Sequence, residues 1–196
     1  EPDNDTGVSP RSIPGQKGGR YLATGNEHNQ SGHISEDPQN RVAQLERRID
    51  KLESIGEDLA ENTSHQTYHG PEDADHGILV WGSQQDTVFE AVDRLNENGH
   101  SVKALGVSDM MPYAADEVSE WLESVDDALV VEMNATAQFR GLTQKELGRY
   151  GEKLTSLLKY NGNPFEPAEI VDGFERNVEG EDLADNSMKF VPAAGD

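Results

Sequence analysis

Two polar residues that follow an apolar run in the middle of the chain are the first candidates for a site. The run 128–131 leads directly into Glu132, and Asn134 follows after one further residue. Ligands of open α/β sheets bind at the carboxyl ends of strands, so both side chains could serve a ligand or an interface. The alternative is equally good: Asn134 caps the next helix, and a buried Glu132 accepts hydrogen bonds from backbone amides.

A cation near the N-terminus is the second candidate. Arg11 stands in the sequence Ser9-Pro10-Arg11 and is isolated within an acidic chain. Its planar guanidinium matches the geometry of a carboxylate. The spacing alone favours an ordinary surface ion pair over a ligand-binding role.

The six histidines do not predict a metal site. His65 and His69 have the spacing of one helix face, but polar sequence surrounds them and a Gly-Pro pair follows. His28 and His33 stand beside acidic residues in an irregular segment. We expect solvated histidines and local hydrogen bonds at these positions, and no metal.

Several cofactor signatures are missing from the sequence. The turn 82–86 has the sequence Gly-Ser-Gln-Gln-Asp, which can cap a helix but lacks the glycines of a dinucleotide-binding loop. There is no Walker A sequence. The chain has no cysteine, so it can hold neither a disulfide nor a cysteine-ligated cluster.

The charge balance limits the partners. The chain of 196 residues carries 38 acidic and 16 basic residues, a formal net charge of −22. This charge argues against binding to nucleic acid or to an anionic membrane surface. Acidic residues are spread among periodic apolar ones, which favours adaptation to molar salt over intrinsic disorder. No apolar run could span a bilayer and no signal peptide is visible, so we expect a cytoplasmic protein.

The N-terminal part of the chain should be irregular and then helical. Residues 1–40 are rich in turn-forming residues and predict an extended arm, the tail end of a preceding domain, with one short strand at 20–24. The start at Glu1 without an initiator methionine indicates a trimmed chain or a fragment. Apolar residues at helical spacing predict an amphipathic helix over 41–55, capped by Ser35 or Asp37 and packed on a core. Residues 56–76 are predicted to be an acidic linker.

The rest of the chain predicts an α/β domain over residues 77–178, followed by a loose tail, 179–196. Short apolar runs alternate with amphipathic segments, which indicates a mostly parallel sheet covered by helices on both faces, a three-layer fold. The expected strands are 77–82, 101–107, 128–132 and 154–159, and the expected helices are 84–98, 116–124, 136–150 and 167–177.

A series of short motifs resembles one family along nearly the whole chain. The segment 9–15 (SPRSIPG), the pattern 24–38 (TGNEHNQSGHISEDP), the strand end 80–83 (VWGS), the segment 132–139 (EMNATAQF) and the segment 159–165 (KYNGNPF) follow in the family's order. They resemble the C-terminal portion of the α subunit of 2-oxoacid:ferredoxin oxidoreductases, including its transketolase-C-terminal-like domain. Ala137 stands where the family often has glycine, and Asn29 where it often has aspartate. The acidity resembles that of haloarchaeal members.

This resemblance implies a function for the holoenzyme and a supporting one for the chain. The family decarboxylates a 2-oxoacid on thiamine diphosphate with Mg²⁺, passes electrons through an iron–sulfur cluster to ferredoxin and forms an acyl-coenzyme A. The cofactors would be held by the β subunit and by a domain before Glu1, so no catalytic residue and no cofactor is expected here. The chain would supply scaffold and subunit interface.

By the same resemblance, Arg11 becomes a candidate ligand for the oxoacid carboxylate. Interface or structural candidates are the motif residues Glu27, His28, Glu132, Asn134 and Gln138. Two other functions stay open. One is a non-catalytic α/β interaction module derived from the same fold. The other is a nucleotide-binding regulatory domain, which the missing phosphate loop disfavours.

Overall fold

The chain divides into two compact units, which are described separately. The computed structural model describes residues 9–22, 24–62 and 65–180. The first unit covers residues 1–64 and the second residues 65–196. None of the helices in the described ranges is both long and apolar enough to cross a membrane.

The first unit consists of an irregular arm and one long helix, α1 (Pro38–Asn62). Asp37 begins the helix: its side-chain Oδ1 accepts a hydrogen bond from the backbone N–H of Gln39 at 3.1 Å, and Pro38 fills the first helical position. In the arm, residues 20–22 and 24 are not in a strand, so the strand predicted there is wrong. An antiparallel bridge joins His28 to Ile34 instead.

Helix α1 is longer than the predicted 41–55. Residues 56–62 are polar, which suggested a linker, but they include the good helix formers Glu, Leu and Ala, and these continue the helix. Four of its apolar residues, Val42, Leu45, Ile49 and Ile55, are exposed to solvent in the described part of the chain. The exposed fractions are 54% for Val42, 43% for Leu45 and 56% for Ile49. The prediction that the apolar face of this helix packs on a core is therefore not confirmed within the described residues.

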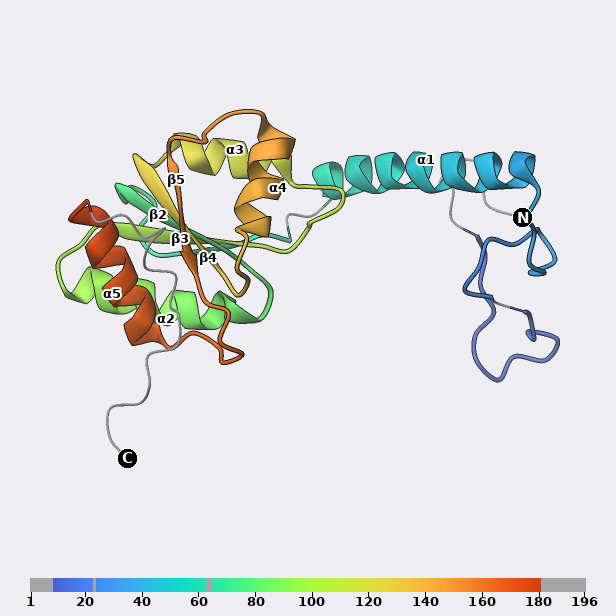
Figure 1. Cartoon of the computed structure of the whole chain (residues 1–196), viewed down its shortest axis with the longest axis horizontal. Helices are drawn as coiled ribbons and strands as arrows, with labels where there is room; N and C mark the ends of the chain where they lie inside the picture. Colours follow the sequence, from blue (N-terminus) through green and yellow to red (C-terminus); the bar gives the residue numbers. More distant parts are fainter. Residues whose placement is uncertain (1–8, 23, 63–64, 181–196) are drawn as a thin grey trace. The chain divides into compact units, whose positions relative to one another are not determined.

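The second unit is a five-stranded sheet with helices on both faces (Figure 1). The strand order is β1-β3-β2-β4-β5, and all neighbours are parallel except β1, which runs antiparallel along the edge of β3. This confirms the predicted α/β class with a mostly parallel sheet. The strands are β1 (Thr67–His69), β2 (His76–Trp81), β3 (Val102–Val107), β4 (Asp127–Glu132) and β5 (Leu154–Leu158).

Helices α2 and α5 cover one face of the sheet, and α3 and α4 cover the other, which completes the three layers (Figure 1). Helix α2 ends as its glycine predicts: Gly99 has φ +95°, and the N–H of His100 reaches the carbonyl of Leu95 at 3.0 Å. The helical elements are the 3₁₀ turn η1 (Gly82–Gln84), α2 (Gln85–Glu97), α3 (Ala115–Glu123), α4 (Gln138–Leu147) and α5 (Pro167–Val178).

The predicted linker 56–76 is wrong over two stretches, and its last residue, His76, begins β2. Residues 56–62 continue α1, and Thr67–His69 form strand β1. A three-residue polar strand has no hydrophobic periodicity, so tertiary pairing with β3 decides its conformation. His69 also contacts α2: its ring stacks on Phe89 at 4.7 Å, and its Nε2 lies 2.8 Å from a carboxylate oxygen of Asp93. Of the predicted tail 179–196, only residues 179 and 180 lie inside the described range.

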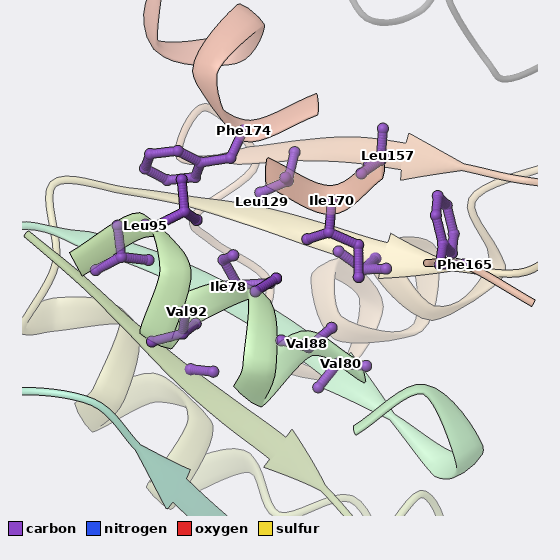
Figure 2. Packing of buried hydrophobic residues seen from close by; sticks show 14 residues of the cluster. Ile78, Val80, Val88, Val92, Leu95, Leu129, Leu157, Phe165, Ile170 and Phe174 are labelled. Carbon is purple, nitrogen blue, oxygen red and sulfur yellow. The ribbon is translucent and has the colours of Figure 1, made fainter. Parts of the chain in front are cut away.

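Two apolar clusters hold the layers together. Figure 2 shows the cluster under α2 and α5, where Ile78, Leu129 and Phe174 are fully buried. A second cluster lies under α3 and α4 around Trp121 and Phe139. Each fully buried side chain of this size contributes about 1.5–3 kcal/mol. The packing of α5 on β5 is close: a Cβ added at Gly173 would lie 2.7 Å from the side chain of Leu157.

Candidate functional site

The turn between β4 and α4 brings the predicted residues Glu132, Asn134 and Gln138 together. Glu132 is the last residue of β4 and only 1% exposed. Its carboxylate accepts hydrogen bonds from the backbone N–H groups of Phe139 at 2.7 Å and Arg140 at 3.2 Å. These amides belong to the first turn of α4, where intrahelical acceptors are missing and the helix dipole favours a negative charge.

Asn134 completes this arrangement. Its Nδ2 donates to Oε2 of Glu132 at 2.6 Å, and its Oδ1 accepts from the backbone N–H of Thr136 at 3.0 Å and Gln138 at 3.3 Å. Gln138 is the first residue of α4, and its side chain is exposed. The geometry therefore favours the structural interpretation of Glu132 and Asn134, as caps of α4.

Ala137 carries the local strain of this turn. Its backbone lies in the left-handed region, with φ 51° and ψ 49°. For an L-residue with a Cβ this conformation costs about 1–2 kcal/mol. Glycine adopts it freely. Ala137 therefore occupies a position where the backbone requires positive φ, which glycine would adopt without strain.

A shallow cavity of about 460 Å³ lies at the carboxyl ends of β2 and β3. Trp81, Ser108 and Met110 line it, together with residues of the turn after β2, but Glu132 and Asn134 do not. In that turn the buried Gln84 accepts a hydrogen bond from the backbone N–H of Phe165 at 3.0 Å. The turn is thus bound to the chain after β5.

The arm is attached to α1 by an ion-pair cluster around Glu27. Its Oε2 lies 3.2 Å from Arg41 and 2.7 Å from Arg48, two arginines separated by two helical turns. The hydrogen bond from Arg48 holds the pKa of Glu27 below its ordinary value, and Glu27 in turn raises the pKa of Arg48. Nearby, the Nδ2 of Asn40 donates to the backbone carbonyl of His28 at 3.2 Å.

The arm and α1 together form a second cavity, of about 570 Å³, which we call the arm cavity. It contains two of the predicted residues, Arg11 and His28. Sequence reasoning missed Arg20, Gln44 and Arg47, which also line it. No aspartate or glutamate is among the described residues that line it. The complete lining is Ser9, Pro10, Arg11, Ser12, Gly18, Gly19, Arg20, Tyr21, Leu22, His28, Asn29, Gln30, Ser31, Gly32, Gln44 and Arg47.

The donor set of the chain does not fit the inorganic cofactors that the resemblance implies. Cysteine is absent from the sequence. Within the described ranges, no three His, Asp or Glu side chains come together as metal ligands. His65 and His69, which share the spacing of one helix face, bind different partners, Asp109 and Asp93. We therefore derive no chemical step through a metal or cluster on this chain.

Comparisons with known proteins agree with the motif series. The sequence model of the pyruvate:ferredoxin oxidoreductase core domain II matches residues 74–170. The chain is 34% identical over 161 residues to 2-oxoacid:ferredoxin oxidoreductase 1, subunit alpha, of Sulfurisphaera tokodaii, covering 82% of this chain and 24% of the relative. The subunit of the same name from Aeropyrum pernix is 34% identical over 152 residues, covering 76% and 23%.

A solved structure shows the same similarity. The 2-oxoglutarate:ferredoxin oxidoreductase of Magnetococcus marinus, with 2-oxoglutarate, coenzyme A and succinyl-CoA bound, superposes with a TM-score of 0.66 at 26% identity. The match covers 89% of this chain and 30% of that one. The chain spans about a quarter of the length of the curated relatives it matches. The chain belongs to the family of 2-oxoacid:ferredoxin oxidoreductase α subunits, of which it represents one portion.

Proposed function

We propose that this chain works as part of a 2-oxoacid:ferredoxin oxidoreductase, which converts a 2-oxoacid to an acyl-coenzyme A and passes the electrons to ferredoxin. The observation that carries this proposal is the 34% identity to α subunits over 161 residues. A match of this length extends beyond the α/β unit into the first unit of the chain. The chain supplies scaffold and interface. Its partners are the β subunit, ferredoxin through the holoenzyme, and the 2-oxoacid.

The chemistry of the reaction lies on other parts of the enzyme. Thiamine diphosphate with Mg²⁺ would supply the electron sink for decarboxylation, and an iron–sulfur cluster would carry the electrons. Coenzyme A would accept the acyl group. This chain's own contribution is to bind and orient. The exposed apolar stripe of α1 and the charged arm are the surfaces that the partner subunit or another part of the polypeptide would cover.

Arg11 is the residue of this chain that we propose touches the substrate. It is exposed on the arm and lines the arm cavity, where no carboxylate from the described residues competes for it. A guanidinium binds a carboxylate through two parallel hydrogen bonds, which fixes the orientation of the oxoacid as well as its position. Orientation of the carboxylate sets the direction in which the keto carbon faces its reaction partner.

Kinetics of an Arg11 variant test this role. Arg11→Ala in the assembled enzyme should raise the KM for the oxoacid about tenfold or more, because a charge-assisted hydrogen bond contributes about 1.5–3 kcal/mol. The matched control is Arg94→Ala, since Arg94 is an exposed α2 residue paired with Glu90. An unchanged KM in the Arg11 variant would refute the contact. Absence of any oxoacid-dependent activity in the wild type would instead support a non-catalytic interaction module.

The net charge of −22 supports a proposal about the working environment. We propose a cytoplasm with molar salt, where the Debye length falls to about 3 Å and self-repulsion between carboxylates is screened. Thermal stability should then rise steeply as KCl is increased towards the molar range. A melting temperature that is independent of KCl would contradict salt adaptation.

A further inference from the structure

Large apolar side chains are exposed along one edge of the sheet in the second unit. Trp81 is the last residue of β2 and is 46% exposed, and Met111, in the loop after β3, is 63% exposed. Met133 comes directly after β4 and Tyr160 shortly after β5, with exposed fractions of 42% and 44%. Because β2, β3, β4 and β5 run parallel, these residues all come at the carboxyl edge. Exposed apolar groups gathered in this way mark an interaction surface.

The turns at this edge are fixed by hydrogen bonds from buried side chains. After β2, the Oε1 of Gln84 accepts from the backbone N–H of Phe165 at 3.0 Å. After β3, the backbone N–H of Ser108 donates to Oε1 of Gln66 at 2.8 Å. The turn after β4 is held by the contacts of Glu132 described above. A surface that is already ordered loses little conformational entropy when a partner binds, which favours docking.

The cavity of about 460 Å³ at the ends of β2 and β3 combines aromatic, apolar and acidic walls. Trp81 and Met110 line it, and the Trp81 ring is backed by the buried Phe139, at 6.4 Å between ring centroids. Asp86 is the charged residue among its lining residues. Within the described ranges, no hydrogen bond or ion pair involves the Asp86 carboxylate.

These walls call for an occupant that is both cationic and apolar. A purely apolar group would remove water from Asp86 without giving its carboxylate a partner, which is unfavourable. An anion would be repelled by Asp86, which lies in the first turn of α2. A lysine or arginine side chain suits both walls, because its apolar stem can pack on Met110 while its cation contacts the Trp81 ring and Asp86.

We propose that the carboxyl edge around Trp81 is a docking surface for a segment of another protein that presents an arginine or lysine between apolar side chains. The basic side chain enters the cavity, and the flanking apolar residues cover Met111 and Met133. The excess of acidic over basic residues, 38 against 16, makes the chain complementary to a basic partner. A small polyamine would match the charge but leave the methionines exposed.

Photo-crosslinking from a single thiol tests which molecule occupies this edge. The sequence contains no cysteine, so Ser83→Cys places one thiol at an exposed position of the cavity lining. The full chain, labelled there with a benzophenone, is irradiated in a native extract in molar KCl, and the attached peptide is sequenced. We expect a segment of another protein with an arginine or lysine beside large apolar residues. Glu97→Cys, exposed at the end of α2 and outside the lining, should not capture this segment.

The affinity for that segment, made as a synthetic peptide, then tests the individual contacts. Trp81→Ala should weaken binding about thirtyfold or more, as expected for an aromatic side chain at the centre of an interface. Val178→Ala is the matched control, because Val178 is 45% exposed at the end of α5, and it should change the affinity less than about twofold. Asp86→Lys should reject the peptide, and a peptide with glutamate in place of its basic residue should prefer Asp86→Lys to the wild type.

A second variant separates lost binding from lost folding. Met111→Glu should weaken peptide binding about tenfold, because the interface would desolvate the new carboxylate. Since Met111 is 63% exposed, the urea midpoint should stay that of the wild type.

Several results would overturn the proposal. These are the absence of a crosslink specific to Ser83→Cys, a crosslink to a second copy of this chain recognised by isotope labelling, and a captured segment without a basic residue. An unchanged affinity of Trp81→Ala would also refute it. None of these measurements requires turnover of an oxoacid, so the docking surface and the proposed enzymatic function are tested independently.

Discussion

Glu132→Gln tests whether the buried carboxylate is the cap of α4. The substitution keeps the size of the side chain and replaces one carboxylate oxygen by an NH₂ group. In the less costly orientation the amide oxygen still accepts from Phe139 and Asn134, and the NH₂ group meets the backbone N–H of Arg140, which donated to Oε1. Two donors then face each other inside the protein, where Glu132 is 1% exposed.

The expected loss of stability follows from these contacts. Loss of one hydrogen bond to a charged group costs about 1.5–3 kcal/mol, and loss of a negative charge at a helix N-terminus adds about 0.3–1 kcal/mol. We expect Glu132→Gln to lower the free energy of unfolding by about 2–4 kcal/mol. Urea unfolding in molar KCl, followed by circular dichroism, measures this as a shift of the midpoint at constant slope.

The control for this measurement is Glu97→Gln. Glu97 is exposed at the end of α2, and its substitution removes the same charge with an expected effect within about 0.5 kcal/mol. A Glu132→Gln midpoint equal to that of Glu97→Gln would refute the capping role. If stability were unchanged while the KM for a substrate rose, the interface or ligand interpretation of Glu132 would replace the structural one.

Three further changes test other parts of the structure. Ala137→Gly should raise the free energy of unfolding by about 0.5–1 kcal/mol, because glycine removes the left-handed strain at a smaller entropic cost; a lower value in urea unfolding would contradict it. The lowered pKa of Glu27 means that its contribution to stability is complete above its ordinary pKa and is lost as the pH falls through the lowered value; Arg48→Gln should weaken this acid dependence in thermal scans, and an unchanged dependence would exclude the pair as its cause. Burial raises the pKa of Tyr113 to about 12, so the stability that the protonated phenol contributes is complete below pH 10 and is lost as the pH rises towards 12; Tyr113→Phe should remove ultraviolet titration amplitude near pH 12, and loss of amplitude near pH 10 would contradict its burial.

The α/β unit could be predicted because its strands are buried on both faces. Continuous apolar runs such as 78–80 have few alternatives to a central parallel strand, and the glycine after α2 marks the helix end in the sequence itself. Strand β1 could not be predicted. Its three residues are polar or partly exposed, and only pairing with β3 makes them a strand.

The candidate sites, too, could be predicted from the sequence only in part. The carboxylate of Glu132 follows a buried strand, so its location at the carboxyl edge was predictable, although its orientation towards α4 was not. The arm cavity depends on contacts between distant residues. Glu27 and Arg48 are 21 positions apart, and no local pattern indicates that they pair or that Arg47 then lines a cavity with Arg11. The Arg47-Arg48 pair was the available signal, but it is equally typical of a solvated helix face.

The most direct test of the central claim is a pull-down of the tagged chain from native cells in molar KCl, followed by a dye-reduction assay with 2-oxoacids and coenzyme A. Membership of a 2-oxoacid:ferredoxin oxidoreductase predicts a brown, cluster-containing partner and dye reduction that requires both the oxoacid and coenzyme A. A colourless chain without a partner and without oxoacid-dependent activity would contradict the claim.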